Sequence, residues 1–271
     1  MSATFQSCAP LSRNRRNGTD NATRPNRTVE IGVVRVMRNL TVSLFFSACV
    51  SFAGPVWAQA VLLDEGSFVV EIGGRAIGTE NFRIRRSGFG DNAQVIAQGT
   101  LEIAGDAGRQ TIQSALGTVG IGMTLDAYQV KVAGPGELQV LLQRRGDRLV
   151  AETTSDAGVE EREYRRPSTR RPTIILDRFM AHHYFFLGPY QNPGESSVSI
   201  VRPRPGGQTE GVLRMASVEP LSVGDRTLQA QRLQLVLEGA IHELWLDSQN
   251  RVLRVEIPGE DYVAARLAPP S

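Results

Sequence analysis

The residues of this chain best suited to chemistry are its three histidines. His182 and His183 are adjacent in an apolar segment, and His242 stands beside Glu243 in a later run. With Asp177 these side chains could meet as a metal site, because imidazole and carboxylate groups are zinc ligands. Adjacent residues of a helix point about 100° apart, however, so such a pair rarely ligates one ion. We therefore expect one histidine of the pair to pack in the core, with a ring nitrogen bonded to a backbone carbonyl, and the other to reach the surface; no metal, cofactor or catalytic residue is predicted.

A second candidate for chemistry is a set of carboxylates on strand-like runs, Glu71, Glu80 and Glu102. Two of them in one cleft could serve as a general acid and a general base. The sequence places them in no cleft, so we expect solvated positions opposite Arg83 or Arg85. The motifs of a serine-hydrolase elbow, a zinc protease or a phosphate-binding loop do not occur in the sequence. An enzyme is therefore the last of the three function classes that we consider.

A cluster of arginines could attract anionic lipid headgroups. Its members are Arg162, Arg165, Arg166, Arg170 and Arg171. Glu160, Glu161 and Glu163 stand in the same stretch, and exposed neighbours of opposite sign form ion pairs with one another. We therefore predict local neutralisation here, with no docking surface for a membrane.

The segment 37–58 has the features of a secretory signal peptide. Met37-Arg38-Asn39 gives a charged start, residues 40–56 are apolar, and Trp57-Ala58-Gln59-Ala60 supplies small residues for cleavage. Cleavage after Ala58 is preferred over cleavage after Ala60, and lipidation of Cys49 is a weaker alternative. Residues 1–36 form a polar, Arg-rich leader, or lie upstream of a true start at Met37. Residues 59–271 are accordingly expected to be a single β-rich domain in the periplasm or secreted.

The composition of residues 59–271 limits the kinds of partner and cross-link that this domain can have. Residues 1–58 hold seven of the 30 Lys and Arg and two of the 28 Asp and Glu, which leaves 23 basic and 26 acidic residues in 59–271. This slight acidity argues against nucleic acid as a partner. Both cysteines, Cys8 and Cys49, precede residue 59, so the exported domain would hold no disulfide. No membrane span is expected in it either.

Alternation of apolar and polar residues indicates short, half-buried strands through most of 59–271. The alternating apolar positions include Phe68-Val70-Ile72, Phe82-Ile84, Tyr128-Val130-Val132, Leu138-Val140-Leu142 and Leu233-Leu235-Leu237. Two-residue turns with glycine are predicted at 73–74, 146–147 and 224–225, and a fourth hairpin turn at 247–250. Because no helix-length crossover separates these runs, the strands are expected to pair antiparallel.

The segment 176–187 differs from the rest, because large apolar side chains recur there at helical spacing. They are Phe179, Met180, His183, Phe186 and Leu187. Asp177 could cap the start of a helix, and Gly188 followed by Pro189 could end it. We predict a short buried helix at 176–187. A long antiparallel sheet should curl around it, so the fold class is mainly β, an open or half barrel that wraps one helix.

Three stretches of the sequence carry a resemblance. They are Phe68-x-Val70 through Gly73-Gly74-x-x-Ile77-Gly78-x-Glu80-x-Phe82-x-Ile84, then Asp177-x-Phe179 with His182-His183-Tyr184, and finally Leu244-Trp245-Leu246-Asp247 with Arg251-Val252-Leu253-Arg254-Val255-Glu256. They resemble a family of uncharacterised bacterial periplasmic β-rich proteins, whose architecture is similar to that of the periplasmic lipoprotein carriers. The resemblance implies a half-open barrel with an apolar cavity, and ligand binding by analogy alone.

The function expected from these observations is non-catalytic binding or carriage of an apolar, lipid-like molecule in the cell envelope. Envelope proteins are further candidate partners. The side chains expected to line the cavity are Phe82, Phe179, Met180, His183, Phe185, Phe186 and Trp245. The alternative is a structural or protein-interaction module in which the helix fills the barrel completely.

Overall fold

The computed structural model describes residues 60–271 except 106–107, 166–170 and 205. The expected leader 1–36, the signal peptide 37–58 and the cleavage site at Ala58 lie outside the described residues. Within the described part no helix is long and apolar enough to cross a membrane.

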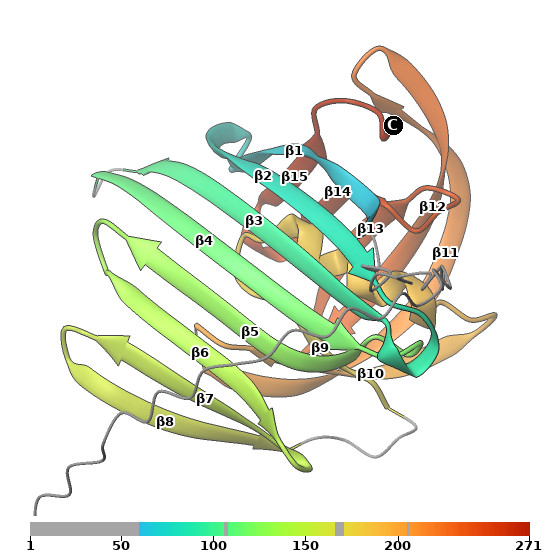
Figure 1. The fold of residues 1–271 in the computed structure, drawn as a ribbon. Coiled ribbons are helices and arrows are strands. Elements are labelled where there is room, and N and C mark those ends of the chain that lie inside the picture. Colours follow the sequence, from blue (N-terminus) through green and yellow to red (C-terminus); the bar gives the residue numbers. More distant parts are fainter. Residues whose placement is uncertain (1–59, 106–107, 166–170, 205) are drawn as a thin grey trace, which may run out of the picture. The chain divides into compact units, whose positions relative to one another are not determined.

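A 15-stranded sheet dominates the described residues, and it curls around a short helix (Figure 1). The strands are β1 (Val61–Ile72), β2 (Arg75–Ser87), β3 (Gln94–Gly105), β4 (Gly108–Val119), β5 (Thr124–Ala133), β6 (Leu138–Arg145), β7 (Arg148–Ser155), β8 (Gly158–Arg165), β9 (Thr173–Ile175), β10 (Glu195–Arg202), β11 (Gly207–Val223), β12 (Arg226–Leu237), β13 (Ala240–Leu246), β14 (Val252–Ile257) and β15 (Tyr262–Arg266). The helical elements are η1 (Gly90–Asn92), η2 (Ala181–Tyr190) and η3 (Pro258–Glu260). The prediction of a curved antiparallel sheet around one short buried helix is confirmed.

Strand order follows chain order, with β1 and β15 side by side in the middle and β8 and β9 at the two edges. Arg266 on β15 spans this seam, because its guanidinium donates to both carboxylate oxygens of Asp64 on β1 at 2.7 and 2.9 Å. The Gln208 side chain on β11 donates to the carbonyl of Arg165 on the edge strand β8 at 2.6 Å and accepts from the Arg165 N–H at 3.1 Å. A side-chain amide thus bonds the β8 edge to β11, the third strand from the other edge.

The hairpin turns follow the predicted glycine chemistry. Gly73 and Gly74 both have positive φ, which a type I′ turn requires. In the Gly146-Asp147 turn the glycine has positive φ, as in a type II′ turn, and the predicted turn at 247–250 also forms. The antiparallel rule has one exception among the described residues, because β9 pairs with β10 in parallel. The chain between these two strands makes the crossover that a parallel pair needs, and η2 lies in it.

The helix boundaries were predicted incorrectly. The structure has a 3₁₀ helix at Ala181–Tyr190 in place of a helix at 176–187, and Asp177 does not cap it. Residues 176–180 are irregular because tertiary contacts hold them: Leu176 N–H donates to the Val201 carbonyl at 3.1 Å, and Phe179 has φ 67°. Pro189 lies within the helix and does not terminate it. The segment carries local helix signals, but contacts with distant strands determine the conformation of residues 176–180.

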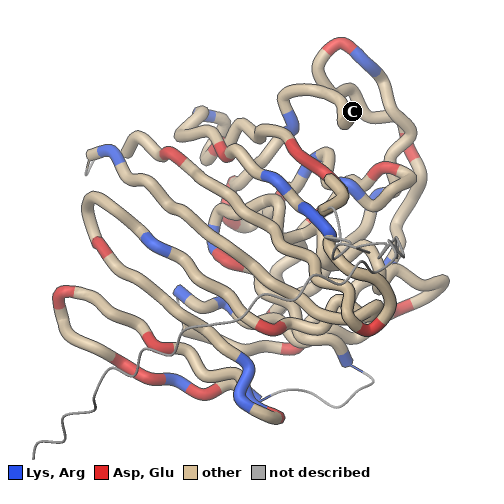
Figure 2. The backbone as a smooth tube through the Cα atoms, in the orientation of Figure 1, with Lys and Arg blue, Asp and Glu red and all other residues tan. Residues whose placement is uncertain are grey.

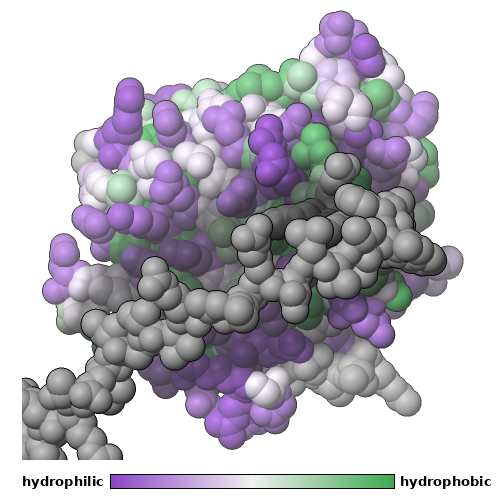
Figure 3. All heavy atoms as spheres, viewed as in Figure 1, coloured by the Kyte–Doolittle hydropathy of each residue, from purple (hydrophilic) through white to green (hydrophobic). Residues whose placement is uncertain are grey.

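The core lies between the inner face of the sheet and η2. Eight consecutive residues of η2, from Ala181 to Gly188, are buried, which accounts for an apolar segment with no polar face. A second, smaller cluster of Val223, Ala230, Trp245 and Leu253 packs apart from this core. Charges of both signs are interspersed along the strands (Figure 2), and the face seen in Figure 3 mixes hydrophilic and apolar side chains.

Candidate functional site

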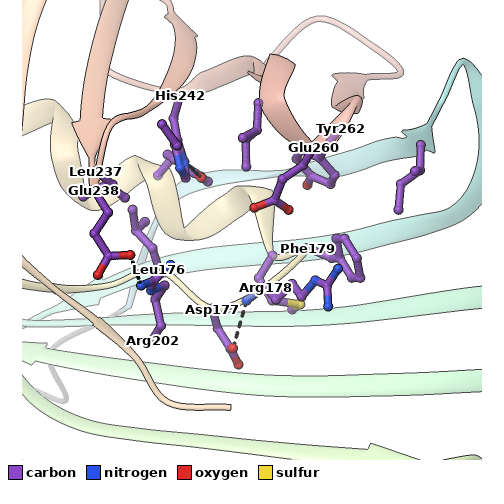
Figure 4. Close-up of a pocket in the computed structure, with 15 residues that line it drawn as sticks. Leu176, Asp177, Arg178, Phe179, Arg202, Leu237, Glu238, His242, Glu260 and Tyr262 are labelled. Carbon is purple, nitrogen blue, oxygen red and sulfur yellow. Dashed lines mark hydrogen bonds and ion pairs between the residues drawn. The ribbon is translucent and has the colours of Figure 1, made fainter. Parts of the chain in front are cut away.

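A pocket of about 630 Å³ opens beside the start of η2 (Figure 4). The irregular segment before η2 forms one wall, and the β12–β13 turn, β14, η3 and the start of β15 form the other. Its lining residues are Ile72, Leu176, Asp177, Arg178, Phe179, Met180, Tyr184, Arg202, Leu237, Glu238, Ala240, His242, Ile257, Glu260 and Tyr262. The volume lies in the range of about 300–1,000 Å³ that is typical of small-molecule sites.

The larger part of the buried lining of the pocket is apolar. Leu176, Met180, Leu237 and Ile257 are buried there, and Ile72 on β1 is half-buried. Leu237, Ile257 and Ile72 come from strands far apart in sequence, and each strand turns these apolar positions inward. There they meet Leu176 and Met180 of the irregular segment before η2. An apolar molecule in contact with them would gain roughly 25 cal/mol for each Å² removed from water.

The rim of the pocket carries charges of both signs. Arg202 on β10 donates to Glu238 at 2.7 Å, while Arg178 and Glu260 are exposed. Figure 4 shows the Glu238–Arg202 pair on one side of the opening and Glu260 on the other. The rim therefore suits a polar or zwitterionic end of a ligand better than an apolar one.

Phe179 lies at this rim in a left-handed backbone conformation, with φ 67°. Such a conformation is uncommon for a bulky residue and occurs most often where surrounding contacts enforce it. Here the ring stacks on Tyr262 with a centroid separation of 5.7 Å, and the Arg178 guanidinium lies 4.6 Å from the ring centroid on Phe179. The strained residue thus places an aromatic ring between a surface cation and a buried phenol.

Tyr184 and His242 form a neutral hydrogen-bonded pair in the wall, 2.6 Å apart. Burial, as the main cause, and the nearby Arg202 charge together lower the pKa of His242 to about 4. Burial also raises the pKa of Tyr184. At neutral pH the phenol is therefore protonated, and we assign it as the donor to Nδ1 of His242. That tautomer leaves the Nε2–H of His242 as a further donor.

Tyr262 has a different environment, because its hydroxyl is buried and has no hydrogen-bond partner among the described residues. Burial is the largest cause that raises its pKa, and the charges of Glu80, Tyr184 and Glu260 act in the same direction. The phenol therefore stays protonated. It offers an O–H donor in the wall of the pocket.

A buried polar cluster lies next to the pocket and holds the start of η2. Glu80 on β2 accepts from the Ala181 N–H at 2.8 Å, and its other oxygen is bonded to Nδ1 of His182. The prediction of a solvated Glu80 is wrong, since the side chain is fully buried. The sequence could have indicated this burial, because Glu80 lies on the same face of the strand as Phe82 and Ile84, which both face the core.

His183 is also fully buried, so the expectation that one of the two adjacent histidines reaches the surface is wrong. Its Nδ1 accepts from the Asp177 N–H at 3.2 Å and is not bonded to a carbonyl. Burial lowers the pKa of His183 well below its usual range, and the neighbouring His182 and Arg204 add to the effect. The two imidazole rings lie 4.4 Å apart at 66°, which is an edge contact between aromatic rings.

Asp177 anchors the irregular segment to the sheet. Its carboxylate accepts from the Tyr128 hydroxyl at 2.6 Å and from Nε of Arg204 at 2.9 Å. Within the described residues, no three His, Cys, Asp or Glu side chains come together as a metal ion would require. Asp177 itself lines the pocket, and these bonds hold its carboxylate in place, so the cluster positions the pocket wall.

The residues predicted to line the cavity are divided between three places. Phe179 and Met180 line the pocket. Phe82, His183, Phe185 and Phe186 are buried in the main core, where Phe82 stacks on Phe68 and His182 at 5.1 and 5.9 Å. Trp245 lies in the smaller cluster, and its indole N–H donates to Glu219 at 2.8 Å.

Sequence reasoning missed Tyr184, Arg202, His242 and Tyr262 as pocket residues. Their signals are weak, because Arg202, His242 and Tyr262 are single positions in strand-like runs and Tyr184 is one aromatic residue within the apolar segment 176–187. In the arginine cluster, Arg162 pairs with Glu160 at 2.7 Å as predicted, whereas Arg171 pairs with Glu210 on β11, which is not one of the acids predicted to neutralise it. Arg166 and Arg170 lie outside the described residues.

Comparisons with known proteins give little further guidance. No family model matches the chain, and no curated protein matches it. Among solved structures, the chain is similar to a β-barrel-like protein of domain of unknown function DUF1849 from Brucella abortus. The identity is 8% and the TM-score 0.45, over 78% of this chain and 98% of the other. A likeness at this level assigns neither a family nor an activity.

Proposed function

We propose that the protein binds an amphipathic, lipid-like molecule in the pocket beside η2, without catalysis, and that it does so in the cell envelope. The observation that supports this most is the division of the pocket into an apolar interior and a charged rim. An acyl chain would occupy the interior, and the polar end would remain among Arg178, Arg202, Glu238 and Glu260. The location in the envelope is supported by the signal-peptide features of residues 37–58.

The alternative, a structural or interaction module, is favoured by a different observation. The side chains of η2 fill the barrel interior, since Phe185, Phe186 and Leu187 are each no more than 6% exposed. The pocket of about 630 Å³ lies at the start of η2, beside this packed interior. A ligand would therefore occupy one end of the barrel and leave its centre packed.

The decisive experiment is lipid analysis of the purified protein together with dye binding. Organic extracts would be examined by mass spectrometry, and binding of N-phenyl-1-naphthylamine would be followed by fluorescence. We expect co-extracted lipid, and saturable dye binding that Ala240→Trp abolishes, because that side chain would project from the pocket wall. Ala157→Trp in the β7–β8 turn is the matched control, since Ala157 is exposed and lies outside the pocket.

A clean protein that binds no dye would reject ligand binding and favour the interaction module. The location is tested separately. The full chain with a C-terminal tag should appear in the periplasmic or extracellular fraction with Gln59 as its first residue. Recovery of the uncleaved chain from the cytoplasm would reject export.

A further inference from the structure

The unpartnered hydroxyl of Tyr262 restricts what the pocket can bind. This side chain is 3% exposed, and its oxygen has no hydrogen-bond partner among the described residues. A buried hydroxyl left unpaired costs about 1–3 kcal/mol, and native proteins pair nearly all such groups. Because Tyr262 lines the pocket, a ligand there is well placed to supply the missing acceptor.

The position of the Tyr262 ring is fixed by a stacking contact and by strand pairing. Phe179 stacks on it at 5.7 Å with an interplanar angle of 25°, and β15 holds its backbone between β1 and β14. Packing therefore holds the phenol in place. A ligand would not have to break a hydrogen bond between this hydroxyl and another side chain of the described residues. A preorganised donor of this kind favours an acceptor at one depth in the pocket.

The charges near the hydroxyl indicate which acceptor fits. Besides burial, the negative charges of Glu80 and Glu260 both raise the pKa of Tyr262, so they would also repel a further negative charge placed beside it. Of the two arginines that line the pocket, Arg178 is exposed and lies over the far partner in the stack, Phe179, and Arg202 is paired with Glu238. A ligand carboxylate at the depth of Tyr262 would be desolvated beside other negative charges, which is costly without a buried cation. An uncharged acceptor such as a carbonyl oxygen avoids that cost.

We propose that the ligand is an uncharged acyl ester, whose carbonyl oxygen accepts a hydrogen bond from the Tyr262 hydroxyl. This inference rests on the proposed function, because it names the ligand class of the same pocket. The acyl chain then contacts Leu176, Met180, Leu237 and Ile257, and the alcohol part of the ester faces the rim. A free fatty acid of the same length is disfavoured, since its carboxylate would occupy the place of the ester carbonyl.

The test compares three probes of equal chain length as competitors of N-phenyl-1-naphthylamine. They are 1-monododecanoylglycerol, its ether analogue 1-O-dodecylglycerol, which lacks the carbonyl oxygen, and dodecanoic acid at pH 8. We expect the ester to displace the dye at roughly tenfold lower concentration than either of the others, which is the effect of one hydrogen bond. Tyr262→Phe should bring ester and ether to equal affinity, with both competitions referred to the dye affinity of the variant itself.

Tyr190→Phe is the control variant, because that hydroxyl bonds to the Gly122 carbonyl at the other end of η2, outside the pocket. It should preserve the preference for the ester. Equal affinity of ester and ether in the unmodified protein would overturn the inference, as would an ester preference that survives Tyr262→Phe or tighter binding of the acid. In those cases lipid binding itself would stand. Failure of every probe and of the dye would instead reject the proposed function.

Discussion

Glu80 and Ala181 are joined by a hydrogen bond of 2.8 Å from the backbone N–H of the first residue of η2 to a carboxylate oxygen on β2. The N–H groups of a first helical turn have no partner within the helix. Here a side chain of the surrounding sheet satisfies one of them in the interior, where water cannot. The bond therefore fixes both the start of the helix and the adjoining wall of the pocket.

Replacement of Glu80 by Ala should destabilise the protein by about 2–4 kcal/mol. Two buried donors, the Ala181 N–H and the His182 ring, would lose their acceptor, and each such loss costs about 1–3 kcal/mol. Urea unfolding followed by circular dichroism measures the change. Glu102→Ala on the neighbouring strand β3 is the control, because Glu102 is exposed. A loss for Glu80→Ala no larger than for the control would contradict the role assigned here.

Gly99→Ala tests the close packing of His182 on β3. A Cβ atom at Gly99 would lie 2.8 Å from Nδ1 of His182 and 3.0 Å from the Met180 side chain. Overpacking of this kind costs about 1–3 kcal/mol, and it should also weaken dye binding, since Met180 lines the pocket. Gly122→Ala has open space around the added atom and should change stability little. The prediction fails if the two variants unfold at the same urea concentration.

Stability should fall as the pH is lowered from 7 to 5.5. The pKa of His242 is lowered to about 4 and that of His183 well below 6.5 in the folded protein. Below pH 6.5 the unfolded chain therefore takes up protons that the folded chain cannot, so this contribution is complete above 6.5 and is lost as the pH falls. Each histidine should cost about 1 kcal/mol over this interval.

The measurement is urea unfolding across that pH range. His242→Gln should remove about half of the dependence, because it deletes one of the two titrating groups and leaves His183. Stability that is constant between pH 7 and 5.5, or that rises on acidification, would show that the histidines are not held neutral by the fold.

Arg266→Ala should cost about 3–5 kcal/mol, because it leaves the Asp64 carboxylate buried without its partner across the β1–β15 seam. Burial already raises the pKa of Asp64 in spite of the arginine. Arg254→Ala is the matched control, since its pair with Glu256 is partly exposed and such pairs contribute about 0–1 kcal/mol. The double variant Asp64→Ala with Arg266→Ala should recover part of the loss, and a strictly additive result would argue against direct coupling.

The sequence predicted the fold class well, because its signals are local. Alternation in β5, from Tyr128 to Val132, follows from one strand face that packs on the core. The turn at Gly73-Gly74 follows from a backbone conformation that glycine adopts without a steric penalty. Such features depend on a few neighbouring residues and can be inferred without knowledge of partners.

The pocket could not be inferred in the same way, because most of the contacts that build it are non-local. Glu80 is separated from Ala181 by 101 positions and Asp64 from Arg266 by 202. Whether a glutamate on an alternating strand is solvated or buried depends on the segment that the curled sheet brings against it. The sequence by itself determined strands, turns and one apolar segment. Tertiary structure decided where the helix begins, which polar groups are enclosed, and that Tyr262 faces a pocket without a partner, because burial is set by packing across the whole sheet.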